Sequence, residues 1–400
     1  MVTPATDAPL RTGLAPLRSR AFRRYVAGQL PSITCSWAQV VALSAVVVAL
    51  DPGALGWVVM LQFLPTLVLG PWCGALADRV DRRTLLMAAE AGLGLVAVVF
   101  AVAAATGRLT LPVIGVLALV WGTVNAVDTP ARRALTPQLV PAAAAPAAAA
   151  LSGTLMLAGM TLGAALGGLL VPAFGAAVVF GINALSFLVD VAVLATLPIG
   201  ASPRTPRAPR QVRDGLAHVW HTPTLRRPVV VLAVVATTTF SYQVSVPILV
   251  QEQLGGGAGA IGAALAVFTA GSLVGTLVAA VIGRPDPRTA AAATGVVAAG
   301  QLLVGLAPAL APAGLAVAGL GWSVLLSTVL AQLQRARPDI LGRVMALFAT
   351  VLLGATVVSS PLAAGLAAAA GATAPFLLGG IAAALTAAVA ATPRPGPRGS

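Results

Sequence analysis

The sequence predicts an all-α polytopic membrane protein, and three observations lead to this fold class. Hydrophobic residues make up 58% of the 400 residues, charged residues only 9%, and the mean hydropathy is +0.95, whereas a soluble domain is about 25% charged. The apolar residues form long unbroken runs rather than the alternating segments of a membrane barrel. Because a backbone in lipid must satisfy its hydrogen bonds internally, these runs are expected to be helices.

Twelve apolar segments are long enough to be membrane-spanning helices. A bilayer core about 30 Å thick needs roughly 20 helical residues, and the fourth segment, at 111–127, is short by this measure. The predicted transmembrane helices cover residues 25–49, 54–76, 84–105, 111–127, 147–171, 176–198, 228–250, 259–282, 289–308, 312–333, 344–368 and 374–392.

The arginines predict the orientation of these helices. All 24 basic residues are arginine, and on the twelve-helix topology every one except Arg108 falls on one side, in the two termini or in every second connection. Cytoplasmic loops carry the Lys/Arg excess. We therefore expect a protein of the bacterial inner membrane with both termini in the cytoplasm. Nucleic acid is not an expected partner, because a basic domain and aromatic stacking platforms are both missing.

The longest polar stretch divides the chain into two halves of six helices. It is proline-rich at first and then has room for a short interfacial helix at residues 211–220. A short repeat supports the division, since Gly175-Ala176-x3-Phe180 recurs as Gly371-Ala372-x3-Phe376. The expected organisation is a basic arm (1–24), a six-helix bundle (25–198), a cytoplasmic linker (199–227), a second bundle (228–392) and a cytoplasmic tail (393–400).

The connection between the second and third predicted helices holds the most specific motif. It resembles motif A of the major facilitator superfamily, G-x-x-x-D-R-x-G-R-R, through Gly74, Asp78, Arg79, Arg82 and Arg83, with Asp81 at the position of the second glycine. The flanking sequences at 17–29, 61–65, 125–133 and 342–345 resemble the enterobactin-exporter-like and macrolide-efflux-like branch. The resemblance extends over about residues 17–390.

This resemblance implies the major facilitator fold, with two six-helix bundles related by pseudo-two-fold symmetry, and a secondary transporter rather than an enzyme. It places Asp78 against the start of the helix at 344–368, in one conformational state only; a carboxylate at a helix N-terminus is stabilised by about 0.3–1 kcal/mol. Asp81 stands where many members have glycine, and it adds a charge partner for Arg82, Arg83 or Arg132. The alternative is a solvated basic loop.

Glycines spaced four apart form stripes on two predicted helices. Such spacing lets helix backbones approach closely. The resemblance assigns these stripes to the contact between the two halves, with generic membrane packing as the alternative. An antiporter motif is only partly matched, because Ala164 replaces its proline. The residues of the stripes are Gly159, Gly163 and Gly167, and Gly271 and Gly275.

Two acidic residues lie well inside predicted helices, namely Glu90 and Asp190. Ionisable groups there are costly and face the bundle interior or a cavity. A carboxyl removed from water can exchange protons near neutral pH, so both are candidates for proton coupling. The alternative is a structural ion pair with a loop arginine such as Arg83. No arginine lies in the middle of the predicted helix 111–127, where many proton-coupled relatives carry one.

Six uncharged polar side chains are candidates for lining a substrate cavity. Each could instead form an interhelical hydrogen bond, typically worth about 0.6 kcal/mol. The candidates are Gln39, Asn125, Asn183, Tyr242, Gln243 and Gln301.

Other chemistries find no support in the sequence. No cluster of carboxylates or cysteines lies near His218 and His221, so no metal site is expected. A P-loop is excluded because the chain has no lysine. Cys35 and Cys73 fall in apolar segments and read as small buried hydrophobes. We expect no cofactor.

These observations predict proton-coupled efflux of small hydrophobic or amphipathic molecules. The predicted helices contain no arginine that could bind an anionic group, which favours a neutral or cationic substrate. Two alternatives remain open, an uptake permease and a membrane interaction or sensor protein on the same fold. The expected partners are a small-molecule substrate, protons as coupling ion and the lipid bilayer, and the protein is expected to be a monomer.

Overall fold

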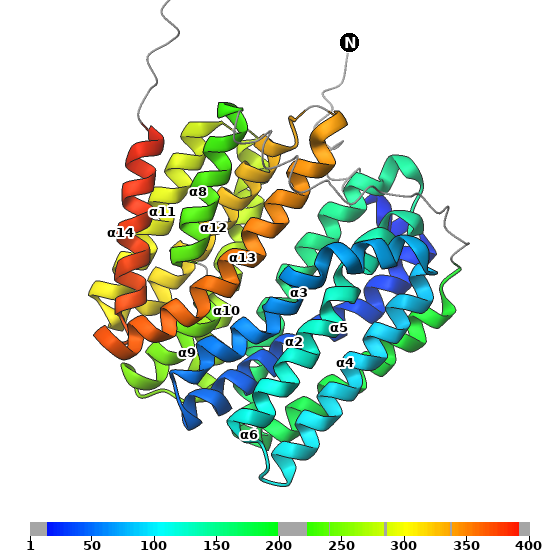
Figure 1. Cartoon of the computed structure of the whole chain (residues 1–400), viewed down its shortest axis with the longest axis horizontal. Helices are drawn as coiled ribbons and strands as arrows, with labels where there is room; N and C mark the ends of the chain where they lie inside the picture. Colours follow the sequence, from blue (N-terminus) through cyan, green and yellow to red (C-terminus); the bar gives the residue numbers. More distant parts are fainter. Residues whose placement is uncertain (1–13, 199–221, 240, 284–285, 337, 392–400) are drawn as a thin grey trace, which may run out of the picture. The chain divides into compact units, whose positions relative to one another are not determined.

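The computed structural model describes residues 14–198, 222–239, 241–283, 286–336 and 338–391, and every regular element in these ranges is helical (Figure 1). The predicted linker with its interfacial helix, and the tail at 393–400, lie outside the described residues apart from the end of the linker at 222–227. The α-helices are α2 (Arg20–Leu50), α3 (Ala54–Arg79), α4 (Arg82–Ala105), α5 (Leu111–Leu135), α6 (Ala145–Thr196), α8 (Pro223–Thr239), α9 (Tyr242–Glu252), α10 (Ala258–Ile282), α11 (Pro287–Leu306), α12 (Ala311–Leu333), α13 (Pro338–Ala370) and α14 (Ala374–Ala391). Short 3₁₀ helices are η1 (Ala15–Arg18), η2 (Thr136–Leu139), η3 (Ala142–Ala144) and η4 (Pro308–Leu310).

The described helices have the length and composition of membrane spans. Ten are long and apolar enough to cross a bilayer, with α8 and α9 together counted as one, and Ala54–Gly70 is a shorter apolar helix. Large apolar side chains follow helical spacing on exposed faces, as at Leu95, Val98 and Val102 of α4. Such a surface suits lipid rather than water. The prediction of an all-α membrane protein is therefore confirmed.

One of these helices, α6, is a hairpin of two predicted spans. Gly175 has φ 80° and ψ 164°, a conformation that side-chain-bearing residues rarely adopt, and it interrupts the 52-residue helix. Before Gly175 the helix runs parallel to α2, since Gly159 lies against Ile33 and Gly167 against Ala38. After it the direction reverses. Asn183 then bonds Gln39, and Asp190 lies against Gly28. Counting α6 twice and adding Ala54–Gly70 gives the twelve predicted segments.

The same local structure recurs in the second half of the chain. Gly371, between α13 and α14, has φ 92°, and the phenylalanine five residues later is buried in both places, at Phe180 and Phe376. The short sequence repeat thus encodes a repeated turn. In each case a glycine reverses the chain and the phenylalanine anchors the returning helix.

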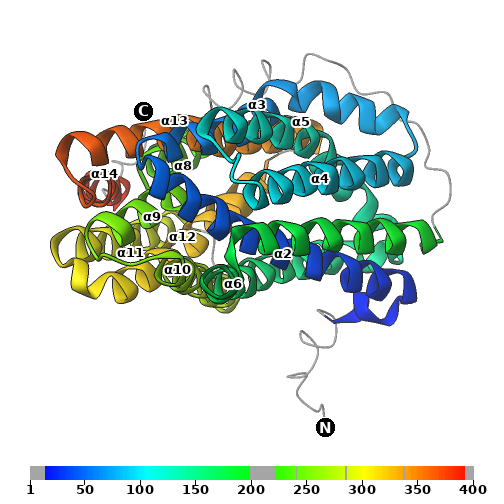
Figure 2. The same ribbon diagram turned by 90° about the horizontal axis from the view of Figure 1, so that it is seen from below.

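The chain divides into two compact units. Unit 1 comprises Met1–Pro209 and Gly256–Ala266, and unit 2 comprises Arg210–Gly255 and Val267–Ser400. In unit 1, α2 packs along α6, α3 packs on α5, and α4 packs on α5 and α6 (Figure 2). In unit 2, α11 packs between α12 and α14, and α8 packs on α13 and α14.

The glycines of both stripes meet neighbouring helices of the same unit, as the alternative of membrane packing expects, and their assignment to the contact between the halves stays a prediction. On α6, Gly159 meets Ile33, while Gly163 and Gly167 meet the backbone of α2. On α10, Gly271 and Gly275 meet the backbone of α12 at Ala316 and Leu320. Close backbone approach is the reason for glycine at these positions. The partners are the neighbouring helices of the same unit.

Candidate functional site

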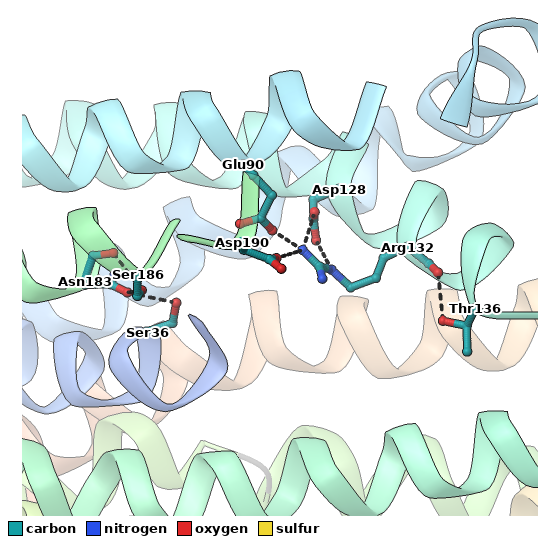
Figure 3. A network of polar contacts seen from close by, with 8 residues as sticks. All are labelled: Ser36, Glu90, Asp128, Arg132, Thr136, Asn183, Ser186 and Asp190. Atoms are coloured by element: carbon teal, nitrogen blue, oxygen red, sulfur yellow. Dashed lines mark hydrogen bonds and ion pairs between the residues drawn. The ribbon is translucent and has the colours of Figure 1, made fainter. Parts of the chain in front are cut away.

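Four ionisable side chains of unit 1 meet where α4, α5 and α6 come together (Figure 3). Arg132, in the last turn of α5, forms ion pairs with Glu90 of α4, with Asp128 one turn before it, and with Asp190 on the second leg of α6. Its Nη2 atom lies 3.2 Å from both Asp128 Oδ1 and Asp190 Oδ2, and its Nε lies 3.3 Å from Asp128 Oδ2. We refer to these four residues as the carboxylate cluster.

The side chains of the carboxylate cluster are largely buried from solvent. The side chains of Asp190 and Glu90 are 0% and 2% exposed, and those of Asp128 and Arg132 are 10% and 15% exposed. Three carboxyls face one guanidinium, so full ionisation would leave two uncompensated negative charges in a poorly hydrated interior. Uncompensated buried charge costs several kcal/mol per ion. Protons on two of the carboxyls would restore neutrality.

Several atoms of the cluster are buried without a hydrogen-bond partner. Among the described residues, these atoms are Glu90 Oε2, Asp190 Oδ1 and Arg132 Nη1. Tyr25 is 1% exposed and lies next to Arg132 and Thr136. Buried polar atoms are nearly always satisfied, by protein or by water. Each of these two carboxyls thus has one oxygen held by the guanidinium and one where a proton could reside.

The length of α5 is what brings Arg132 into the site. The predicted helix ended at residue 127, and Arg132 was counted among the loop arginines; the helix in fact continues through Pro130 to Leu135. The run from Asp128 to Arg133 is mostly polar, so a search for apolar segments ended the helix too early. The spacing of four between Asp128 and Arg132 is the signal that could have revealed it, because such pairs share a helix face. Neither residue is among the predicted proton-coupling or cavity residues.

Glu90 and Asp190, predicted separately, are brought together by this arginine rather than by Arg83. The guanidinium of Arg83 instead donates a hydrogen bond to the Ala195 carbonyl near the end of α6. Arg82 donates to the Ala134 carbonyl near the end of α5, with a distance of 3.4 Å. Both arginines therefore neutralise helix C-termini, where a positive charge is favourable.

The remaining motif A residues are partly described. Asp81 is the N-cap of α4, accepting hydrogen bonds from the Thr84 amide (3.1 Å) and hydroxyl (2.8 Å). The hydroxyl bond is the main cause that lowers the pKa of the Asp81 carboxyl. Asp81 is thus chiefly a helix cap, and the charge of Arg83, one of its three predicted charge partners, makes a smaller contribution to lowering its pKa. Gly74 faces open space. The side chains of Asp78 and Arg79 lie outside the described residues.

The predicted cavity residues mostly form contacts between helices. Asn183 Nδ2 donates to Gln39 Oε1 at 2.8 Å, joining α6 to α2. Ser36 donates to Asn183 Oδ1 at 3.3 Å, as Figure 3 shows. Gln301 Nε2 donates to the Thr239 carbonyl at 3.5 Å. Gln39, Asn183 and Gln301 therefore form hydrogen bonds between helices, which was the stated alternative to lining a cavity.

Three further cavity candidates differ in burial. Tyr242 is buried and stacks on Phe268, with ring centroids 4.2 Å apart. Asn125 and Gln243 are half-buried. Within the described ranges, no group of three or more His, Cys, Asp and Glu side chains has the arrangement to hold a metal ion; His218 and His221 lie outside them.

Comparison with known proteins identifies the chain at the level of family. Residues 11–395 match the MFS family described as "Transmembrane secretion effector". A relative from Bacillus subtilis (strain 168), the uncharacterized MFS-type transporter YfiS, is 29% identical over 307 residues, which cover 74% of this chain and 71% of that protein. The staphyloferrin A transporter of Staphylococcus aureus is 24% identical over 229 residues, covering 56% and 57%.

Solved structures show the same fold. A mutant form of the nucleoside transporter NupG has a TM-score of 0.74 at 10% identity, covering 93% of this chain and 99% of that one. A bacterial homologue of the lysosomal transporter Spinster, in an inward-facing, unoccupied conformation, has a TM-score of 0.72 at 14% identity, covering 94% and 96%. At such identities the likeness shows the major facilitator fold and nothing further.

Proposed function

Because the chain belongs to the Transmembrane secretion effector family of major facilitator transporters, we propose that it exports small hydrophobic or amphipathic molecules, driven by protons, through alternating access. The flanking motifs, which resemble those of the enterobactin-exporter-like and macrolide-efflux-like branch, support export as the direction. The protein is a multi-pass membrane transporter rather than an enzyme. Coupling, direction and substrate class are the parts that we propose.

The excess of buried carboxyls over guanidinium in the carboxylate cluster carries the proposal. With Glu90 and Asp190 both ionised, the cluster is short of positive charge; with both protonated, Arg132 and Asp128 form a neutral pair. Protonation therefore loosens the bonds that tie α4 and α6 to α5. An equilibrium between two conformations shifts when one state binds a ligand better. Protons binding preferentially to one state would drive the transport cycle in this way.

Substrate class follows from the charge that the protein offers. Arg132 is engaged by three carboxyls, so it does not present a free cation to an anionic substrate. The residues of the helices are mostly aliphatic, and aromatic residues are only 4% of the chain. This composition suits a mainly apolar, neutral or cationic compound. The name of the S. aureus relative makes staphyloferrin A a second compound to include in a substrate panel. Solved transporters of this fold include a fucose:proton symporter, so uptake is the alternative direction.

We further propose that both termini and the 199–227 linker lie in the cytoplasm of a bacterial inner membrane, as the arginine distribution suggests. Reporter fusions after Arg227 and Arg398 would then report a cytoplasmic location, and a fusion at Pro52 a periplasmic one. Asp78 and Arg79 of motif A stay candidates for a contact made in only one conformational state.

Transport in inverted vesicles with an imposed pH gradient tests the proposed function. A panel of hydrophobic compounds should accumulate, and Asp190→Asn and Glu90→Gln should abolish gradient-driven accumulation while substrate exchange at equal pH survives. The matched control is Asp51→Asn, which neutralises an exposed acid between α2 and α3. Full gradient-driven activity in both cluster variants would exclude these two acids as coupling sites.

A further inference from the structure

Four exposed arginines lie within seven residues at the start of the first spanning helix. Arg18 ends η1, and Arg20, Arg23 and Arg24 occupy the first turn and a half of α2. None of the four side chains has a hydrogen-bond or ion-pair partner within the described part of the chain. We call these four residues the basic ridge.

The other arginines with described polar contacts satisfy their charge inside the protein. Arg83 and Arg227 donate hydrogen bonds to carbonyls at the ends of α6 and α14, and Arg132 is held by three carboxyls. The arginines of the basic ridge, by contrast, have no partner within the described part of the chain, so their charges can interact with groups outside the protein. Concentrated positive charge of this kind attracts anions.

The backbone beneath the basic ridge is firmly held. Phe22 and Tyr25, on the same stretch of α2 as the arginines, are 0% and 1% exposed. They belong to a core that includes Leu135, Leu139 and Leu194. Ser19 caps α2 by accepting a hydrogen bond from the Phe22 amide, and its hydroxyl donates to the Leu139 carbonyl at 2.6 Å. The guanidinium groups therefore extend from a fixed base, which lowers the entropic cost of binding a ligand.

The depth of the basic ridge matches that of lipid headgroups. The 31 residues of α2 span about 46 Å at 1.5 Å per residue, whereas a hydrocarbon core of about 30 Å needs roughly 20 residues. The surplus lies at the polar start of the helix, where Arg20, Arg23 and Arg24 share one face. Leu14, just before the ridge, is 55% exposed and offers an apolar contact at the same level.

From this arrangement we propose that the basic ridge binds the phosphate groups of anionic phospholipids in the adjacent leaflet. Guanidinium groups bind phosphate oxygens through paired, charge-assisted hydrogen bonds. Basic clusters beside a transmembrane helix are attracted to anionic membrane surfaces. Bound lipid would tie the start of α2 to the membrane surface. The proposal needs neither proton coupling nor a substrate.

Native mass spectrometry of the purified full chain, titrated with phosphatidylglycerol, tests the basic ridge. The variant changes Arg18, Arg20, Arg23 and Arg24 to Gln. A matched control changes four other exposed arginines, Arg108, Arg133, Arg288 and Arg335, to Gln, with the same change in net charge. We expect the ridge variant to bind phosphatidylglycerol at least tenfold more weakly than the parent, because each arginine at an anionic surface contributes roughly fivefold, and the control to bind like the parent.

Equal loss in the two variants, or no loss in the ridge variant, would overturn the proposal. Titration with zwitterionic phosphatidylcholine should be the same for all three proteins; a parallel loss there would show that the ridge recognises no anionic charge. If the fourfold variant does not fold, the double variant R23Q/R24Q is compared with R288Q/R335Q under the same two criteria. No transport is measured, so failure of this proposal is distinguishable from failure of the proposed export.

Discussion

Arg132 and Asp190 are 58 residues apart in the chain, yet Arg132 Nη2 lies 3.2 Å from Asp190 Oδ2 inside unit 1. The same nitrogen also holds Glu90 and Asp128. A single guanidinium thus joins α4, α5 and the second leg of α6. Any change in the charge of one carboxyl alters the hold of this group on the other two.

Replacing Arg132 tests whether the cluster depends on this charge. Arg132→Gln leaves three buried carboxyls without a cation, and breaking a buried pair typically costs about 3–5 kcal/mol. Acidification neutralises the carboxylates and removes their repulsion, so the loss of stability should be larger at pH 8 than at pH 5. Thermal unfolding of the detergent-solubilised protein across this range measures it. A loss that does not change with pH would contradict this, because it would show that the folded variant binds no more protons than the folded parent.

Gly28 should position Asp190. A Cβ atom at residue 28 would lie 2.7 Å from Asp190 Oδ1 and 3.0 Å from Val193 Cβ. Gly28→Ala should therefore displace the carboxyl, with a loss of about 1–3 kcal/mol of stability, as is typical of overpacking, and weaker proton-driven transport. Gly153→Ala is the control, because no heavy atom lies within 4 Å of the added carbon. If both variants behave alike in unfolding and transport, Gly28 is not needed for the position of Asp190.

The cap at Asp81 predicts a pH-dependent contribution to stability. The hydrogen bond from the Thr84 hydroxyl lowers the pKa of Asp81 in the folded protein. The contribution is therefore fully present above the unfolded pKa of about 3.9, and it is lost as pH falls through the lower folded value. Asp81→Ala should cost about 1 kcal/mol at neutral pH.

Two comparisons make the prediction for Asp81 specific. The cost of Asp81→Ala should disappear in strong acid, when measured by chemical unfolding at pH 7 and below pH 3. Asp81→Ser, which keeps a capping oxygen but no charge, should retain most of the stability at both pH values. An equal cost for Ala and Ser would show that the side chain acts as a charge in the loop and not as a cap.

Arg227 should hold the end of α14. Its Nη2 donates hydrogen bonds to the carbonyls of Val389 (3.0 Å) and Ala390 (2.6 Å), at the C-terminal end of that helix. Arg227→Gln removes a cation from a favourable place, typically worth about 0.3–1 kcal/mol, and should make the last turn of α14 more susceptible to proteases. Arg226→Gln, a change of the same charge one residue away, is the control. Equal rates of C-terminal cleavage in the two variants would contradict this role.

Helical spans and the short connections between them follow local rules, so the sequence predicted them. Apolar runs of about 20 residues identify the helices, and the glycines of the two Gly-Ala-x3-Phe repeats mark positive-φ turns at Gly175 and Gly371. The sequence also identified Glu90 and Asp190 as the acids within the helices. Each of these inferences rests on residues that are close together in the chain.

The partners of those residues were decided by the tertiary structure. Arg132 reaches Glu90 and Asp190 only because α5 continues past residue 127 and because α6 folds back at Gly175 beside α4. Gly163 could have served any close helix contact, and packing within unit 1 selected α2. A spacing in sequence states which side chains share a helix face; which neighbour meets that face depends on how all the helices of a unit pack at once.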